Sequence, residues 1–301
     1  MAYKAVARLT NLKPRLYLYC TGSSVSLVRA GQPGATKNNF FRESALPQRV
    51  ECVIVMSTKT MRVVRPGERT NPAGKPIINK LLLAMSDHEF RVIRPHLEYL
   101  PMPHHLILQE AHRRLRAAHF LNSGLISLVV VLKQGKTVEA GVVGSEGATG
   151  IPGLVGLERS SLREVIQVAG DGFRVKTEAL KSILPATPVF QMMLSRYAVV
   201  LGMQIAQTAA CNRLHGVHQR LSRWLLLTQD RVDSGFLPIT HDFLATMLGT
   251  DRPSVTLAAN KLQKMLLIEY VRGAVRILDR KELESVACEC YDAIRQYGHG
   301  R

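Results

Sequence analysis

The side chains best suited to recognise a ligand lie in residues 239–264, where the sequence predicts two short helices. Thr240 takes an N-cap position, and Gly249 stands where a helix ends with positive φ. Asp251 caps the second helix, which has Pro253 in its first turn, where a missing N–H costs nothing. The inward face of this second helix is predicted to consist of Val255, Ala258, Ala259 and Leu262.

The outward face of the second helix combines hydrogen-bond donors with apolar groups. It consists of Arg252, Pro253, Thr256, Leu257, Asn260 and Lys261. A guanidinium can donate two hydrogen bonds to one guanine edge, whereas an apolar side chain can contact a thymine methyl group. Short strands at 267–270 and 274–278 flank Arg272 and Gly273 and predict a β-hairpin wing. Together these elements indicate a winged helix-turn-helix whose second helix enters the major groove of DNA.

The charge of the chain also favours an anionic partner, although the charge is unevenly distributed. The 301 residues include 40 Lys and Arg against 23 Asp and Glu, a net charge of +17. Residues 1–75 contain 13 basic residues and 3 glutamates, so +10 of the +17 lies there and +7 on the other 226 residues. The prediction of DNA binding therefore rests on the local pattern in 239–278.

The cysteines predict reduced thiols, and no metal site is expected. Five are widely spaced, namely Cys20, Cys52, Cys211, Cys288 and Cys290, and the one short spacing, Cys288-x-Cys290, is too short for a usual zinc knuckle. The longest apolar run, 125–132, has 8 residues, far below the ~20 that span a bilayer. We therefore expect a cytoplasmic protein with no membrane partner.

Residues 1–76 differ in composition from the rest of the chain. Basic residues, Asn, Pro and Gly recur there without a sustained amphipathic period, which predicts disorder. Two alternatives are a basic DNA-binding arm and a misassigned start, with translation beginning at Met56, Met61 or Met85.

Residues 77–186 are predicted to form a β-domain. Two short helices come first, with Ser86 as N-cap and Glu89 completing a capping box. Apolar or alternating runs at 106–108, 118–121, 124–132, 137–143, 163–168 and 172–175 then predict strands. Residues 122–124 and 134–136 have the chemistry of turns, and 144–156 form a glycine-rich loop. Several short strands at this spacing are typical of a β-sandwich or jelly roll.

A long helix is predicted over 187–214, followed by the DNA-binding domain over 215–290 and a tail over 291–301. The helix carries a stripe at spacings of three and four, made up of Phe190, Leu194, Tyr197, Leu201, Ile205 and Thr208. Such a stripe is expected for a two-stranded coiled coil, and equally for a helix packed on its own domain. The β-domain has enough apolar strands to close its own core, which favours the dimer.

The segment ITHDFLATMLGTDRPSVTLAANKLQKMLLIEYVRGAVRILDRKELE resembles the C-terminal domain of the Crp/Fnr family of bacterial regulators. The chain also resembles the atypical members that share QTAACNRLHGVHQRLSRWLL and end in ACECY. The resemblance covers about residues 77–290. It implies an α+β chain with a cyclic-nucleotide-binding-like β-roll (77–186), a dimerisation helix (187–214), and a winged helix-turn-helix (215–290) that binds palindromic double-stranded DNA as a homodimer. RNA polymerase is a further implied partner.

The resemblance also assigns roles to individual residues of the DNA-binding domain. The positions that read base edges in the family fall on Arg252, Pro253 and Leu257. Because Pro253 and Leu257 cannot donate hydrogen bonds from their side chains, the DNA site should differ from that of the best-known members. The positions that meet phosphates fall on Thr240, His241, Asp251, Ser254 and Arg272. A carboxylate would repel a phosphate, so the expected role of Asp251 is helix capping.

The effector pocket implied by the family departs further from the family pattern. Where cyclic-nucleotide binders have a Gly-Glu-Leu turn, this chain has Gly150-Ile151-Pro152 without a carboxylate. Arg159, Ser160 and Ser161 imitate the phosphate clamp in a shortened loop, with Arg163 as a second candidate. A cyclic nucleotide is therefore not the expected effector, whose identity the sequence leaves unknown along with any cofactor.

Two other classes of function remain as alternatives. An enzyme could use 144–150 as a phosphate loop, but this segment lacks the lysine of a Walker motif, and no Ser/His/Asp order or HExxH is present, so no catalysis is expected. A regulator could instead act only through a protein partner, with the wing and helix as the interface.

Overall fold

The computed structural model describes residues 4–8, 16–21, 24–29, 64–271 and 273–298, and the chain divides into two compact units, 1–62 and 63–301. In the first unit, β1 (Lys4–Arg8), β2 (Leu16–Thr21) and β3 (Ser24–Arg29) form an antiparallel sheet in that order. The expectation of disorder is therefore wrong for these three segments. The rest of the predicted extension up to residue 63 lies outside the described residues.

The second unit begins before the predicted boundary at residue 76. Arg69 is buried and donates hydrogen bonds to the carbonyls of Leu82 (2.9 Å) and Met85 (2.9 Å), while its guanidinium lies 4.6 Å from the Phe90 ring centroid. Asn71 is also buried and donates to the Leu97 carbonyl at 3.2 Å. Buried polar side chains that bind backbone carbonyls are indistinguishable from loop residues in the sequence, so composition alone predicts a boundary that lies too late.

Two short helices, α1 (Lys80–Leu83) and α2 (Asp87–Ile93), confirm the helical pattern after residue 77. The Ser86 hydroxyl accepts from the Glu89 N–H at 3.2 Å, as predicted for an N-cap. The reciprocal half of the predicted capping box is wrong. The buried Glu89 carboxylate instead accepts from the N–H groups of Val189 (2.9 Å) and Phe190 (3.2 Å), at the start of the long helix α4 (Pro188–Leu214).

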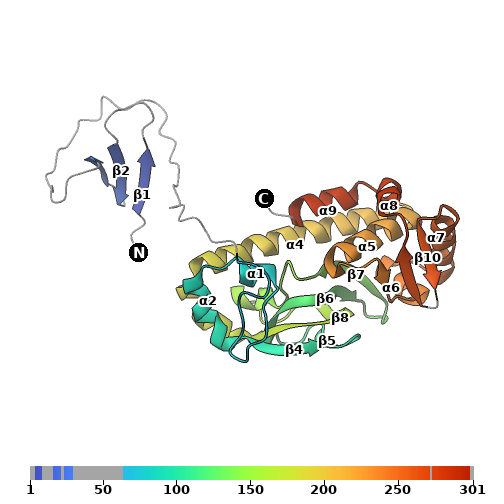
Figure 1. Ribbon diagram of the computed structural model, residues 1–301, viewed down its shortest axis with the longest axis horizontal. Coiled ribbons are helices and arrows are strands. Elements are labelled where there is room, and N and C mark those ends of the chain that lie inside the picture. Colours follow the sequence, from blue (N-terminus) through green and yellow to red (C-terminus); the bar gives the residue numbers. More distant parts are fainter. Residues whose placement is uncertain (1–3, 9–15, 22–23, 30–63, 272, 299–301) are drawn as a thin grey trace. The chain divides into compact units, whose positions relative to one another are not determined.

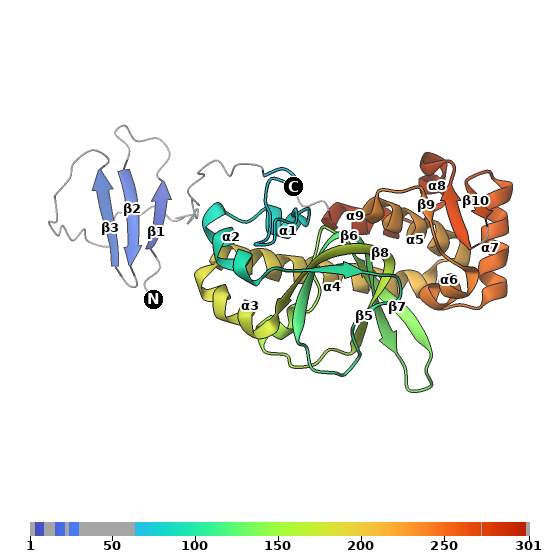
Figure 2. The ribbon, with the colours of Figure 1, turned by 60° about the horizontal axis from the view of Figure 1, so that its bottom comes forward.

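The β-domain is built on two long antiparallel strands, β6 (Ala117–Val131) and β8 (Leu162–Lys176), as Figures 1 and 2 show. The shorter strands are β4 (Glu98–Met102), β5 (Ile107–Gln109) and β7 (Thr137–Val143). The sheet order is β4-β8-β6-β7, with β5 paired to β8. The interior contains Met102, Leu121, Ile126, Leu128, Val143 and Ile166. The predicted α+β class with an antiparallel β-roll is confirmed.

The predicted turn at 122–124 is wrong, because these residues lie inside β6. The register with β8 shifts on both sides of Ser123, which marks β-bulges that bend the strand. Gly124 has φ +86°, and a Cβ there would come within 2.5 Å of the Val168 carbonyl oxygen. Glycine is needed at position 124 because a tight turn and this bend of the strand both require a positive φ and space for a close backbone contact.

The helix α4 confirms the predicted span of 187–214 to within a residue, but its predicted dimer stripe faces its own chain. Phe190 and Leu194 are buried against α1, α2 and the sheet, and Thr208 is buried near the opposite end. The half-buried Tyr197 and Leu201 pack against the β-roll, and Ile205 lies 3.3 Å from the position of a Cβ built on Gly141. The buried Phe190, Leu194 and Thr208 are therefore unavailable to a dimer interface, whereas a role there for the half-buried Tyr197, Leu201 and Ile205 stays a prediction.

The opposite face of α4 is exposed and rich in small and apolar side chains. Its members include Met192, Val199, Met203, Ala206 and Ala209. Within the part of the chain that the structure describes, α4 is the one helix long and apolar enough to cross a membrane, with mean hydropathy 1.3 over an 18-residue window. Only 17% of that window is buried. The apolar character of α4 is thus concentrated on a largely exposed surface, which α9 borders only near Met203 and Ala206.

The remaining short elements of the β-domain are η3 (Ile151–Val155), α3 (Thr177–Ile183) and η4 (Leu184–Ala186), with η2 (Arg94–His96) after α2. The C-terminal domain contains α5 (Val217–Val232), β9 (Phe236–Leu237), α6 (His241–Leu248), α7 (Arg252–Lys264), β10 (Ile268–Val271), β11 (Ala274–Ile277) and α8 (Arg280–Val286). The sheet order is β10-β11-β9.

The predicted C-terminal tail is wrong for residues 291–298. They belong to a last helix, α9 (Cys290–Gly298), which lies along α4 in Figure 1. Tyr291 and Ile294 are buried in the same core as Trp224, and the Tyr291 hydroxyl donates to Asp230 at 3.0 Å. The segment therefore contributes to the fold.

Buried polar contacts join the β-roll to the C-terminal domain. The Trp224 indole N–H of α5 donates to Glu139 of β7 at 2.8 Å, and the Ser127 hydroxyl of β6 donates to the same carboxylate at 2.6 Å. Arg231 of α5 binds Glu146 at 2.8 Å in a second, nearly buried pair. Burial raises the pKa of Glu139 to about 7, against the smaller opposing effect of these two hydrogen bonds.

We predict that Glu139→Gln removes a pH dependence of stability. Because the pKa of Glu139 is raised in the folded state, its contribution is fully present below the ordinary pKa of 4.5 and is lost as pH rises to about 7. The free energy of unfolding of the wild type should fall across this window by at most about 3 kcal/mol more than that of the variant. Urea unfolding at pH 5 and pH 8 measures this difference, with the exposed Glu158→Gln as control. Equal pH slopes for wild type and Glu139→Gln would contradict the prediction.

Candidate nucleic-acid interface

The predicted helix-turn-helix is present, and its caps are those expected. The Thr240 hydroxyl accepts from the Phe243 N–H at 3.2 Å and starts α6, which ends at Gly249 with φ +58°. The Asp251 carboxylate then accepts from the Ser254 N–H at 2.8 Å and starts α7. A Cβ on Gly249 would come within 2.9 Å of the Val138 side chain of β7. Glycine at this position therefore permits the positive φ that ends α6 and also leaves room for the close contact with the β6–β7 hairpin.

The two faces of α7 divide as predicted. The four predicted inward side chains, Val255, Ala258, Ala259 and Leu262, are all buried in the C-terminal core. On the outward face Arg252, Pro253, Asn260 and Lys261 are exposed, Thr256 is half-buried, and Leu257 is 72% exposed. In both views α7 lies at the periphery of the second unit (Figures 1 and 2). No described residue covers this face.

Arg252 has an acidic neighbour that the sequence reasoning missed. Its guanidinium lies 3.2 Å from the Asp242 carboxylate of α6, and both side chains are about two-thirds exposed. Exposed ion pairs of this kind contribute little to stability, so the guanidinium can exchange partners readily. The signal was available in the sequence, because Asp242 stands in the first turn of the helix that packs against the start of α7.

The residues predicted to contact phosphates differ in their exposure and in their hydrogen bonds. Thr240 is exposed, and its hydroxyl hydrogen remains able to donate. Asp251 acts as the helix cap, and its hydrogen bonds from the backbone and hydroxyl of Ser254 lower its pKa. Ser254 is therefore already engaged through its hydroxyl, at 2.8 Å. Arg272 lies outside the described residues.

His241 is half-buried and, unlike Thr240, directs its ring toward groups of its own domain. Its Nδ1 lies 3.1 Å from the Thr256 hydroxyl, and its ring lies 4.1 Å from the Tyr270 ring of β10, centroid to centroid. Its Nε2 is buried without a hydrogen-bond partner among the described residues. Burial, together with the charge of Arg252, lowers the pKa of His241. This histidine therefore connects α6, α7 and the wing as a neutral ring.

The predicted effector residues contact groups of their own chain. The Gly150 N–H donates to the buried Glu164 carboxylate at 3.2 Å, and a Cβ on Gly150 would come within 2.1 Å of the Ala117 carbonyl oxygen. Ile151 is buried in the core of the β-domain. A protein carboxylate thus takes the backbone donor that a phosphate would need.

The arginines and serines of the predicted clamp are also engaged. Arg163 binds Glu110 at 3.0 Å, and Arg159 donates to the His112 carbonyl at 3.1 Å. The Ser160 hydroxyl accepts from the Leu162 N–H, and Ser161 is exposed. In this structure both arginines are therefore paired with groups of their own domain, through contacts that are at least partly exposed.

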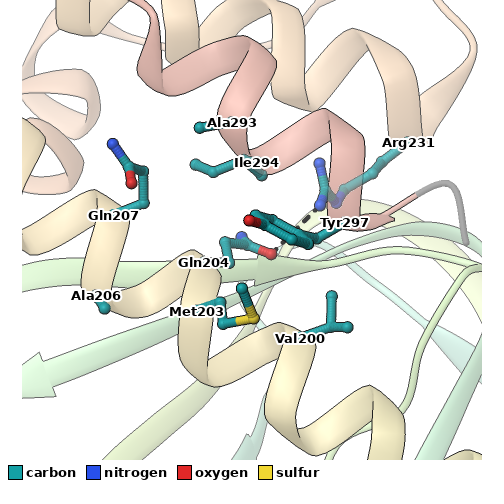
Figure 3. Close-up of a pocket in the computed structure, with 9 residues that line it drawn as sticks. All are labelled: Val200, Met203, Gln204, Ala206, Gln207, Arg231, Ala293, Ile294 and Tyr297. Atoms are coloured by element: carbon teal, nitrogen blue, oxygen red, sulfur yellow. Dashed lines mark hydrogen bonds between the residues drawn. The ribbon is translucent and has the colours of Figure 1, made fainter.

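A pocket of about 330 Å³ lies elsewhere, between α4, α5 and α9 (Figure 3). Met203 and Val200 of α4 face Ile294 and Tyr297 of α9 across it, and Arg231 stands at one end. Arg231 also binds Glu146 and lies 3.4 Å from Gln204, which itself donates to the Val142 carbonyl. The pocket therefore borders the contacts that join the β-roll to the C-terminal domain, and only the presence of α9 creates it.

Three of the five cysteines have side chains that the structure describes. Cys211, Cys288 and Cys290 are free of disulfide bonds among the described residues, and the expectation that they are reduced in solution stays a prediction. The side chain of Cys20 and the whole of Cys52 lie outside the described part of the chain. Nothing in the spacing of the three free thiols predicted that they would meet. The structure brings them together and adds His215, with the four possible ligand atoms within 4.8 Å of one another.

The chain matches a family model and several solved structures. The model of the Crp-like helix-turn-helix domain matches residues 219–286. The structure of FixK2 from Bradyrhizobium japonicum gives a TM-score of 0.56 at 11% identity, over 64% of this chain and 98% of that chain. CLP of Xanthomonas campestris, a c-di-GMP responsive global regulator, gives 0.55 at 15% identity, over 64% and 98%.

A third solved structure, TTHB099 from Thermus thermophilus, is a transcriptional regulator of the CRP family. It gives a TM-score of 0.53 at 18% identity, over 62% of this chain and 96% of that chain. No curated protein matches the chain. Because these identities are low, the solved structures establish the fold, and the family model establishes the C-terminal domain. The chain thus carries a Crp-like helix-turn-helix domain on the fold of the Crp/Fnr transcription regulators.

Proposed function

We propose that the chain is a sequence-specific transcription regulator that binds palindromic DNA sites as a homodimer. The observation that carries this proposal is the outward face of α7, which is uncovered while its inward face is completely buried. A helix held in this way can enter a major groove without unfolding any part of its domain. A role on DNA implies that the chain works in the cytoplasm, with RNA polymerase as a further partner.

Arg252 and Leu257 are proposed to read bases. Arg252 stands in the first turn of α7, and its exposed guanidinium can donate two hydrogen bonds to guanine O6 and N7. Leu257 lies further along the same face, where its 72% exposed side chain suits the methyl group of thymine. Thr240, Lys261 and the half-buried Thr256 flank them and are proposed to contact phosphates or base edges. The side-chain amide of Asn260 can form two hydrogen bonds with the edge of one adenine, at N6 and N7.

Dimerisation is proposed to use the exposed face of α4, in place of the stripe that the sequence suggested. Val199 is 65% exposed and Met192 is 50% exposed, and the two lie about two turns apart on this face. Water-exposed apolar area of this extent on one helix favours burial against a second copy. A symmetric pair would present its two α7 helices to successive major grooves, about 34 Å apart.

A cyclic nucleotide is not the proposed effector. The buried Glu164 carboxylate holds the Gly150 N–H and would repel a cyclic phosphate at that position. Arg159 and Arg163 are held by other groups of the β-domain. The c-di-GMP response named for the Xanthomonas relative is a property of that protein, and the residues here do not argue for it.

We predict that Arg252→Ala weakens binding to the cognate site by about 1–3 kcal/mol, because a bidentate contact to guanine is lost. The site is first selected from a random duplex pool with wild-type protein, and affinities are then measured at fixed salt by fluorescence anisotropy. Arg174→Ala is the matched control, since Arg174 is also an exposed arginine paired with one carboxylate, Glu98, but lies in β8.

Two outcomes would contradict the DNA-binding proposal. One is the absence of any enriched half-site in the selection. The other is equal loss of affinity for Arg252→Ala and Arg174→Ala. If duplexes are ignored even at low salt, where phosphate contacts are strongest, the interface serves a protein partner instead.

We predict that Val199→Glu shifts the protein from dimer to monomer, because a carboxylate would be buried between two α4 helices. Sedimentation velocity over a range of concentrations measures this shift. Leu132→Glu is the matched control, since Leu132 is 54% exposed but follows β6 away from α4. A dimer that survives Val199→Glu, or a wild type that is already monomeric, would contradict this interface.

A further inference from the structure

Three thiols and an imidazole converge where α4 ends. Cys211 lies in the last turn of α4, His215 follows it by about one turn, Cys288 lies between α8 and α9, and Cys290 is the first residue of α9. The Cys211 and Cys288 sulfurs are 3.5 Å apart, and the Cys290 sulfur is 3.6 Å from His215 Nδ1. All three cysteines are buried in one cluster, and His215 is half-buried at its edge.

These distances suit a bound metal ion better than a disulfide. A disulfide needs two sulfurs about 2.05 Å apart, and the Cys211 and Cys288 sulfurs are well beyond that. In a tetrahedral zinc site with Zn–S bonds of ~2.3 Å, neighbouring sulfurs are about 3.8 Å apart. Since all four ligand atoms lie within 4.8 Å of one another, an ion at their centre needs only small side-chain adjustments.

The groups around the cluster are arranged as outer partners of metal ligands. His215 turns Nδ1 toward Cys290, while its Nε2 lies 3.2 Å from the Glu289 carboxylate. A carboxylate that accepts from the far ring nitrogen fixes the tautomer that frees the other nitrogen for a metal. The Gln207 amide donates to the Cys290 sulfur at 3.0 Å, as expected for a thiolate acceptor.

Two buried arginines provide the charge that such a site requires. Three thiolates and one neutral imidazole around a divalent ion carry a net charge of −1. Arg223 and Arg220 of α5 are both buried, and the charge of Arg223 acts on Cys211 and Cys288. The Nε atoms of both arginines are buried without a hydrogen-bond partner among the described residues. A buried guanidinium is costly unless it is compensated by negative charge nearby.

We infer that Cys211, His215, Cys288 and Cys290 bind one zinc ion, which fastens the C-terminal helix α9 to the end of α4. Thiolate and imidazole ligands together select zinc among the common divalent ions, and four protein ligands leave no open position for catalysis. The site lies at the joint between α4 and α5, where the DNA-binding domain begins. Zinc would therefore fix the direction in which this domain leaves the long helix.

The first test measures metal in the full-length protein. After purification without chelator, elemental analysis should find one zinc per chain, and Co²⁺ exchanged into the site should give thiolate-to-cobalt charge-transfer absorption with intense tetrahedral d–d bands. Iron with acid-labile sulfide in anaerobically purified protein would overturn zinc in favour of a cluster. Absence of stoichiometric metal, also after incubation of the reduced protein with Zn²⁺, would overturn the site.

Variants then test the individual ligands. The Cys288→Ser variant should no longer bind zinc. The Cys20→Ser variant should still bind it, because Cys20 lies in β2 of the other unit. Since loss of a structural ion can unfold the domain, His215→Cys provides a gain of signal: zinc should be retained, and the cobalt charge-transfer absorption should increase. Unchanged cobalt spectra for His215→Cys would overturn the assignment of this residue.

Glu289→Gln tests the positioning role of the carboxylate. Such outer partners typically change metal affinity about 10–100-fold. Competition with a chromophoric chelator should therefore show weaker zinc binding by Glu289→Gln, and no change for the exposed Glu282→Gln on α8. Zinc content is measured without DNA, so failure of this inference leaves the proposed function untouched. Equal zinc affinities for Glu289→Gln and wild type would overturn the positioning role.

Discussion

Phe190 and Leu194 bury their side chains almost completely against α1, α2 and the β-sheet, and Cys211 does the same about five turns later against the segment before α9. One face of a single 27-residue helix is thus held by both halves of the second unit. Because the helix is continuous, its two anchored ends fix where the β-roll stands relative to the DNA-binding domain. On the opposite face, Met192 and Val199 remain exposed.

Buried polar groups supply the specificity of this arrangement. Glu89 caps the start of α4 across 100 residues of sequence, Arg69 binds the carbonyls after α1, and Glu139 accepts from Trp224 at the joint between domains. Each of these groups would cost free energy if it lost its partner, because a buried polar group without a hydrogen bond is unfavourable. They therefore select one packing among the many that an apolar core would tolerate. The raised pKa of Glu139 shows that burial disfavours the charged form of this carboxyl group.

The recognition helix depends on the same joint. Gly249 packs against Val138 of the β6–β7 hairpin, so the turn before α7 rests on the β-roll. Glu146 and Arg231 connect the glycine-rich loop to α5, next to the pocket lined by α4 and α9. The inferred zinc site lies at the other end of α5, so α5 is held at both ends.

The local elements of the DNA-binding domain could all be predicted from residue types and their spacing. Caps, the glycine turn and helical periodicity act within a few residues, and each is visible as a residue type at a fixed spacing, as Thr240, Gly249, Asp251 and the buried Val255 illustrate. The buried face of α4 could not be predicted in this way, because a stripe such as Phe190 to Thr208 has the same period whether its partner is a second copy or its own sheet. The convergence of Cys211 with Cys288 and Cys290 was equally hidden, since 77 residues separate Cys211 from Cys288. Caps and turns depend on residues that are neighbours in the sequence, whereas contacts across that distance form only when the chain folds.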